Sequence, residues 1–199
     1  MSRARSGAVV LAAGASVRLG RPKALVGCGE RGETLVRRAC RVALDAAAHV
    51  IVVSRPGLDL GVADLSVTVV ENPDAATGMA SSIRVGIAIL TERDVEVALV
   101  LAVDQPLVET ADLQALLAAL APETPMGAAA YEGTVGIPAA FRREVFASLL
   151  ELTGDHGARY LLRRDGHGVA RVAMAHAAVD IDTPADVPAL GGGLARRDS

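Results

Sequence analysis

The sequence is poor in aromatic residues: it holds two Phe, two Tyr and no Trp among 199 residues. Proteins that bind single-stranded nucleic acids use aromatic side chains to stack on the bases and clusters of Lys and Arg to bind the phosphates. Here Lys and Arg are dispersed along the chain, and the formal net charge is −3. Both features argue against a nucleic-acid partner.

Long apolar runs are absent as well. No apolar stretch approaches the roughly 20 residues that cross a bilayer. The basic start of the chain, MSRARSG, leads directly into a short apolar run without a small-residue cleavage site, which a secretory signal would carry. We therefore expect a cytoplasmic protein with no membrane partner.

Cysteine is scarce, and its spacing excludes two further classes of protein. Cys28 and Cys40 form no C-x-x-C motif, and the four His residues are scattered. Neither a zinc site nor a disulfide framework is indicated. Cys40 falls on the apolar face of an expected helix, where a free cysteine acts as a small hydrophobic residue. This usage fits a reducing compartment.

Short apolar runs alternate with segments of helical periodicity along the chain. This alternation predicts an α/β fold with a mostly parallel sheet and helices on both faces. The length suits one domain; we expect it to span residues 1–190 and to be followed by a disordered tail, 191–199. The expected strands are 8–13, 49–54, 67–70, 96–103, 126–131 and 168–173, and the expected helices are 33–48, 79–90, 110–120 (capped by Thr110), 141–152, 156–164 and 183–190.

The segment after the first expected strand, LAAGASVRLGRPKAL, carries the strongest functional signal. A loop of small residues around Gly14 lets backbone N–H groups approach an anion closely. Arg18 and Lys23 add the positive charge that a phosphate chain requires. The segment predicts a nucleoside triphosphate site, and the alternative is an ordinary glycine-rich surface loop.

Two better-known phosphate loops fit this segment poorly. A Walker A motif needs Gly before the Lys and Ser or Thr after it, whereas Pro22 and Ala24 flank Lys23. A dinucleotide fingerprint needs G-x-G-x-x-G, and Gly14 and Gly20 are too far apart for it. An NAD(P)-dependent reductase is therefore a weaker alternative.

Acidic residues follow the expected strand 96–103 and recur near the end of the chain. Asp104 stands at the tip of that strand, where a carboxylate can hold Mg²⁺ together with substrate phosphates; the alternative is a turn cap next to Pro106. Alternation places Asp180 and Asp182 on the same side of an extended segment, so one of them can complete the cation shell. The alternative there is that Asp182 or Thr183 caps the helix begun by Pro184.

Two further polar segments precede expected helices. Ser81 and Ser82, in the segment that begins at Gly78, can hydrogen-bond a base or ribose or can simply cap the helix. The segment 154–159, GDHGAR, is rich in groups able to bind a second, anionic substrate. Its alternative is a turn with Asp155 as an N-cap.

Six motifs occur in the order found in a known family: LAAGxSxRLGxPK, NPDxxxGMxSSI, DQPL, GxP, GDHGAR and VDIDTPAD. As an ordered set that spans nearly the whole chain, they resemble the MobA-like nucleotidyltransferases and, within them, the molybdenum cofactor cytidylyltransferase branch. The resemblance implies a Rossmann-like, three-layer α/β/α sandwich of the nucleotide-diphospho-sugar transferase type. The implied reaction transfers a nucleoside monophosphate from an NTP to the phosphate of molybdopterin and releases pyrophosphate.

The resemblance also implies partners and residue roles. The partners are CTP or GTP, molybdopterin or molybdenum cofactor, and a molybdenum hydroxylase that receives the product; Ala13, where guanylyl-transferring relatives have Gly, favours CTP. Other phosphate acceptors and a non-catalytic cofactor chaperone remain alternatives. By this resemblance the triphosphate is bound by Ala12, Ala13, Gly14, Arg18 and Lys23, and the base and ribose lie near Gly78, Ser81 and Ser82. Mg²⁺ is bound by Asp104 and either Asp180 or Asp182. The acceptor is bound by Gly136, Pro138, Asp155 and His156. Arg18, Lys23 and Asp104 form the implied catalytic set.

Overall fold

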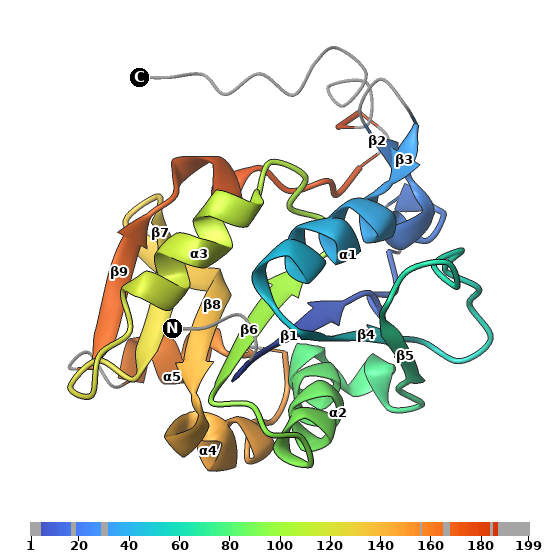
Figure 1. Ribbon diagram of the computed structural model, residues 1–199. Coiled ribbons are helices and arrows are strands. Elements are labelled where there is room, and N and C mark those ends of the chain that lie inside the picture. The colour runs from blue at the N-terminus through green and yellow to red at the C-terminus, as the bar shows by residue number, and fades with distance from the viewer. Residues whose placement is uncertain are drawn as a thin grey trace.

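The computed structural model describes residues 5–16, 19–28, 32–155, 157–164, 168–183 and 185–186. These residues form a seven-stranded sheet with the order β5–β4–β1–β6–β8–β7–β9, covered by helices on both faces (Figure 1). Its strands are β1 (Ser6–Leu11), β4 (His49–Ser54), β5 (Thr68–Glu71), β6 (Val97–Ala102), β7 (Met126–Tyr131), β8 (Thr134–Arg142) and β9 (Val169–Ala173).

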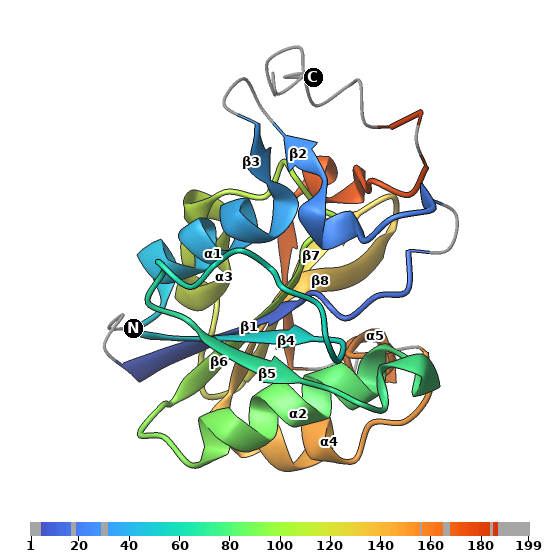
Figure 2. The ribbon, with the colours of Figure 1, turned by 90° about the vertical axis from the view of Figure 1, so that its right-hand side faces the viewer.

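A small two-stranded sheet of β2 (Gly27–Cys28) and β3 (Glu33–Thr34) lies apart from the main sheet, next to the start of the first long helix (Figure 2). The described helices include none long and apolar enough to span a bilayer. They are α1 (Leu35–Ala46), α2 (Met79–Thr91), α3 (Thr110–Ala118), α4 (Phe146–Leu150) and α5 (Arg159–Arg164), with short 3-10 turns η3 (Lys23–Leu25), η4 (Ala75–Thr77), η5 (Arg143–Val145) and η6 (Ala175–Ala178).

The parallel half of the sheet confirms the prediction from alternation. β1 pairs in parallel with β4 on one side and with β6 on the other, and Leu11 stands opposite both Val53 and Ala102. The residues of β6 from Val97 to Val100 are fully buried, as expected for a strand covered on both faces. Because β1 and β6 end side by side, the loops that follow them meet at one edge of the sheet.

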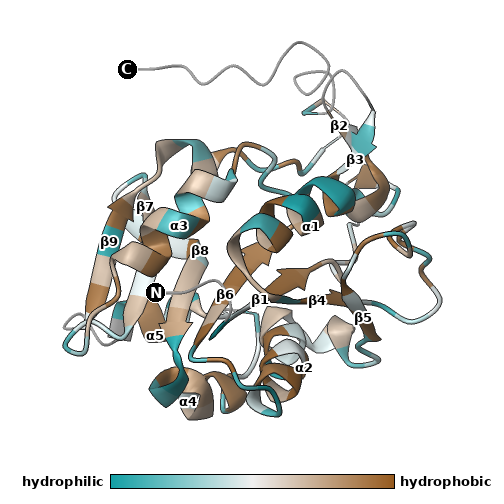
Figure 3. Ribbon diagram, viewed as in Figure 1, coloured by the Kyte–Doolittle hydropathy of each residue, from teal (hydrophilic) through white to brown (hydrophobic). Residues whose placement is uncertain are grey.

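Two apolar layers hold the helices on this sheet. Helices α1 and α3 cover one face, and α2, α4 and α5 cover the other (Figures 1 and 2). The central strands are strongly apolar while the outer surface of α1 is hydrophilic (Figure 3). α1 begins at Leu35 because the Thr34 side chain accepts a hydrogen bond from the Arg37 N–H, as an N-cap does. Cys40 of α1 is fully buried, in line with its predicted place on the apolar face.

The other half of the sheet differs from the prediction. The sequence analysis assigned no strand to residues 134–142, but β8 lies there, antiparallel to both β6 and β7. The helix predicted for 141–152 is wrong in its first part, because Phe141 is fully buried in the sheet and the chain turns helical only after Arg142. Short apolar runs such as this one do not distinguish strand from helix.

Two predictions about helix starts also need correction. Glu109, not Thr110, is the N-cap of α3, and its backbone N–H donates to the Asp112 carboxylate at 2.8 Å. α5 begins at Arg159 rather than at residue 156. The predicted helix 183–190 and the predicted tail 191–199 lie mostly or wholly outside the described residues.

Candidate active site

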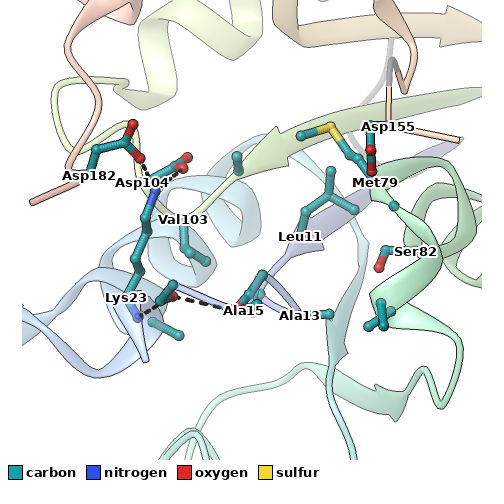
Figure 4. Close-up of a pocket in the computed structure, with 18 residues that line it drawn as sticks. Leu11, Ala13, Ala15, Lys23, Met79, Ser82, Val103, Asp104, Asp155 and Asp182 are labelled. Carbon is teal, nitrogen blue, oxygen red and sulfur yellow. Dashed lines mark hydrogen bonds and ion pairs between the residues drawn. The ribbon is translucent and has the colours of Figure 1, made fainter. Parts of the chain in front are cut away.

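A cavity of ≈ 580 Å³ opens at the edge of the sheet where β1 and β6 end. This volume falls within the range of ligand pockets, about 300–1,000 Å³. Figure 4 shows Lys23, Asp104 and Asp182 together on one side and Met79, Ser82 and Asp155 on the other. The cavity is lined by Leu11, Ala12, Ala13, Gly14, Ala15, Ser16, Lys23, Ala24, Ala75, Ala76, Gly78, Met79, Ser82, Ala102, Val103, Asp104, Asp155 and Asp182.

The loop after β1 forms the floor of the cavity between these two sides. The Ser16 hydroxyl donates to the Gly14 carbonyl at 3.3 Å and accepts from the Lys23 N–H at 2.9 Å, which ties the loop to the start of η3. A Cβ added at Gly14 would meet no atom within 4 Å, so packing within the protein gives no reason for glycine there. Close approach of a ligand remains as a reason. Arg18 lies outside the described residues.

Lys23 joins the two predicted acidic segments. Its Nζ lies 3.1 Å from Asp104 Oδ2 and also contacts Asp182 Oδ1. Burial lowers the pKa of Lys23, but the hydrogen bonds and charges of the two carboxylates outweigh it and leave the pKa above its ordinary value. The amino group is therefore charged at neutral pH and neutralises much of the acidic pair.

The donor set suits a divalent cation. Two carboxylates from distant segments converge on one positive charge, and hard oxygen ligands of this kind bind Mg²⁺ or Mn²⁺. Within the described part of the chain, no group of three or more His, Cys, Asp or Glu side chains is placed to hold a metal. Asp104 and Asp182 would therefore hold such a cation jointly with substrate phosphates and water, which is typical of Mg²⁺.

Asp180 and Asp182, which were expected on the same side of the chain, differ in position. Asp182 lines the cavity, whereas Asp180 does not and is exposed. The Ile181 N–H donates to the Asp104 carbonyl at 2.9 Å, and this bond brings Asp182 beside Asp104. Desolvation by the neighbouring protein, with the charges of Asp104 and Asp182, raises the pKa of Asp180 to about 6. Asp182 is thus the better-placed partner of Asp104.

The start of α2 closes the opposite side. Gly78 has a φ of 115°, and a Cβ there would lie 2.4 Å from Asp155 Oδ1 and 2.6 Å from the Gly154 carbonyl oxygen. The Ser81 hydroxyl has one hydrogen, and the carbonyl oxygens of Gly78 at 2.8 Å and Asp74 at 3.0 Å are both within reach, so it donates within the fold. Of the two serines, only Ser82 lines the cavity.

Asn72 is a residue whose role the sequence analysis missed. It is 1 % exposed, and its side-chain amide donates to the hydroxyls of Ser81 and Ser82 at 2.8 and 3.0 Å. The amide orders both serines at the start of α2. The Asn-Pro-Asp motif was visible in the sequence, but nothing in it indicated which group Asn72 contacts.

The residues expected to bind the acceptor are not all brought together. Asp155 lines the cavity, but Gly136 and Pro138 lie in β8 and do not. His156 lies outside the described residues. The sequence analysis also missed Ala75, Ala76 and Met79, whose side chains help to line the cavity and carry no chemical signal of their own.

Known proteins resemble this chain over nearly its full length. Rv0371c from Mycobacterium tuberculosis H37Rv is 29% identical with a TM-score of 0.77, and the match covers 95% of this chain and 98% of that one. A structure of Rv0371C from the same organism in complex with manganese is 28% identical, with a TM-score of 0.70 and coverage of 94% and 97%. CMP:2-keto-3-deoxy-manno-octonic acid synthetase complexed with CTP shares the fold at 17% identity, with a TM-score of 0.72 and coverage of 94% and 96%. No curated protein sequence matches the chain.

The family model described as the MobA-like NTP transferase domain matches residues 8–171. This stretch holds the loop after β1, Lys23, the start of α2 and Asp104, which form most of the cavity wall. The chain therefore belongs to the MobA-like NTP transferase family, within the nucleotidyltransferase class of enzymes.

Proposed function

We propose that this protein transfers a nucleoside monophosphate, CMP in preference to GMP, from an NTP to the phosphate of molybdopterin or molybdenum cofactor and releases pyrophosphate. The observation that carries the proposal is the convergence of Lys23, Asp104 and Asp182 on one wall of the cavity. One fixed cation and two carboxylates are the groups needed to bind a triphosphate with a divalent metal.

The nucleotide lies along the loop after β1. Backbone N–H groups around Gly14 face the phosphates, and the open space around Gly14 leaves room for them. The base and ribose extend toward the start of α2, where Ser82 and Asp155 are the polar groups on the wall. Ala13 and the CTP bound by a protein of the same fold support CTP.

The reaction is an in-line displacement at the α-phosphorus. An oxygen of the acceptor phosphate donates an electron pair to form the new P–O bond, and the bond between the α-phosphorus and the bridging oxygen breaks. That oxygen leaves with its electron pair as part of pyrophosphate. Catalysis then depends on orientation and on neutralising charge, with no covalent intermediate on the protein.

Each charged group has a part in this step. Asp104 and Asp182 would hold Mg²⁺ or Mn²⁺, which would supply positive charge against the phosphates. Lys23 moves from the carboxylates to the triphosphate and stabilises the departing pyrophosphate, together with Arg18. Asp104 and Asp182 would act on the α-phosphate only through the cation they hold, because carboxylates repel a phosphate.

Pyrophosphate release tests the proposal. Purified protein with Mg²⁺ and molybdenum-loaded molybdopterin is given CTP or GTP in parallel. We expect release that requires the acceptor and is faster with CTP; a preference for GTP would keep the chemistry and overturn the choice of base. Release without acceptor, or none with either nucleotide, would contradict the proposed acceptor.

A pair of variants links the chemistry to the site. Asp104→Asn is expected to abolish release while the melting temperature stays close to that of the wild type. Asp64→Asn is the matched control, because it neutralises an exposed carboxylate paired with Arg37, away from the cavity wall, and it should leave release unchanged. Wild-type turnover by Asp104→Asn would refute the metal role.

A further inference from the structure

The turn after β6 is fixed by a side chain that does not itself line the cavity. Gln105 is 8 % exposed, and its side-chain amide donates to the Ile137 carbonyl at 3.0 Å and to the Ala177 carbonyl at 2.7 Å. The amide group has only two hydrogens to donate, and both are used. Gln105 thus connects the end of β6 to β8 and to η6.

The bond to Ala177 bears directly on the acidic pair. η6 ends at Ala178, and the chain then runs through an extended stretch to Ile181 and Asp182. The Ile181 N–H donates to the carbonyl of Asp104, the residue before Gln105. Asp104 and Gln105, adjacent residues of the turn after β6, therefore hold the segment 177–182 at two points, one on each side of Asp180.

We infer that Gln105 is a positioning residue that places Asp182 at the correct distance from Asp104 for a shared divalent cation. The inference rests on the proposed function, in which these carboxylates bind the metal. Gln105 does not line the cavity and acts through the backbone of η6. Groups that orient metal ligands in this way typically change metal affinity by 10- to 100-fold when they are replaced.

Methionine is the informative replacement because it has nearly the same length and cannot donate. Ile137 retains a second donor, the Tyr131 hydroxyl, 3.3 Å from its carbonyl oxygen. The hydrogen bond whose loss matters most in Gln105→Met is therefore the one to Ala177, which precedes Asp182 in the chain. The side-chain oxygen of Gln105, Oε1, is buried with no hydrogen-bond partner among the described residues. Its removal in Gln105→Met therefore costs no hydrogen bond.

A second side chain provides a control for a purely structural role. Arg143 donates to the carbonyls of Thr91 and Val95, each at 2.8 Å, next to the start of β6. It thus joins segments by binding backbone carbonyls, as Gln105 does, but at the opposite end of the strand from the cavity. Arg143→Met should lower stability without affecting the acidic pair.

The experiment measures Mn²⁺ binding to the whole protein without nucleotide, by electron paramagnetic resonance of free Mn²⁺, together with melting temperature. We expect the Kd of Gln105→Met to rise by about tenfold, that of Arg143→Met to equal the wild-type value, and Asp104→Asn to lose binding. An unchanged Kd in Gln105→Met would overturn the inference while leaving the proposed function intact. Where the wild type binds Mn²⁺ only in the presence of CTP, the same variants are compared with CTP present; failure of the wild type to bind Mn²⁺ in either condition would overturn both.

A measurement on the wild type covers the case in which Gln105→Met does not fold. Hydrogen exchange of the Ile181 amide reports whether the segment 177–182 is held against the end of β6. We expect strong protection, comparable to that of amides in β6, because the bond to Asp104 opens only when the contacts of Gln105 open. Exchange as fast as in an unstructured chain would overturn the inference.

Discussion

Replacement of Lys23 by methionine is expected to change metal affinity and nucleotide affinity in opposite directions. In the nucleotide-free protein the Lys23 amino group binds both Asp104 and Asp182, so a divalent cation that uses these carboxylates has to displace it. Removal of the amino group abolishes this competition. The same change removes a positive charge from the proposed triphosphate site.

The size of the effect follows from the two contacts. A hydrogen bond to a charged group contributes about 1.5–3 kcal/mol net. The three side chains keep 17%, 27% and 33% exposure, and solvent screening at this exposure places the pair toward the low end of that range. We therefore expect a gain of about 1.5 kcal/mol in Mn²⁺ binding, which corresponds to slightly more than tenfold.

The assay compares wild type, Lys23→Met and Arg37→Met by Mn²⁺ titration without nucleotide and by CTP titration with Mn²⁺. Arg37 pairs with Asp64 on the surface, so Arg37→Met controls for the change in formal net charge from −3 to −4. We expect tighter Mn²⁺ binding and weaker CTP binding in Lys23→Met alone. Equal or weaker Mn²⁺ binding in that variant would refute the displacement argument.

Three further outcomes are expected. Gly14→Ala should leave the melting temperature unchanged and weaken CTP binding at least several-fold, because its Cβ meets no protein atom but enters the path of the phosphates; a calorimetric Kd equal to the wild type would contradict this. Gly78→Ala should lower the free energy of unfolding, measured in urea, by about 1–3 kcal/mol. The new Cβ would meet the Gly154 carbonyl oxygen at 2.6 Å, at a residue whose φ is 115°. A decrease below about 0.5 kcal/mol, near the size of ordinary surface effects, would contradict this. Burial raises the pKa of Cys40 to about 12 from 9.0, so the native thiol should resist iodoacetamide at pH 8, as mass spectrometry would detect. Since the native state retains this proton while the unfolded state loses it, the stabilisation is present below pH 9 and declines as pH rises toward 12.

The parallel half of the fold could be predicted because β1, β4 and β6 are buried, mainly apolar runs, and because the helices α1, α2 and α3 lie between or after the strands of this half. β6 and α1 are examples: the burial of Val97–Val100 and of Cys40 follows from the pattern alone. β8 could not be predicted, because Gly136 and Pro138, which belong to residue types depleted in strands, interrupt its apolar run. Only its pairing with β6 and β7 shows what it is.

The candidate site could likewise be predicted only in part from the sequence. Asp104 stands just after β6, and Lys23 lies in the segment that follows β1, so both were expected at one edge of the sheet; in the structure they are 3.1 Å apart. The choice between Asp180 and Asp182 depends on the bond from Ile181 to Asp104, which no local pattern contains. The contacts of Gln105 and Asn72 are likewise made to residues distant in sequence.

A crystal structure of the complex with Mn²⁺ and a non-hydrolysable CTP analogue would show whether Asp104 and Asp182 hold the metal at the triphosphate. Anomalous diffraction at the manganese edge locates the ion without ambiguity. We expect one peak bound by Asp104, Asp182 and the phosphates, with the Lys23 amino group moved onto the triphosphate. A manganese peak away from this pair, or Lys23 still between the two carboxylates beside bound nucleotide, would contradict it.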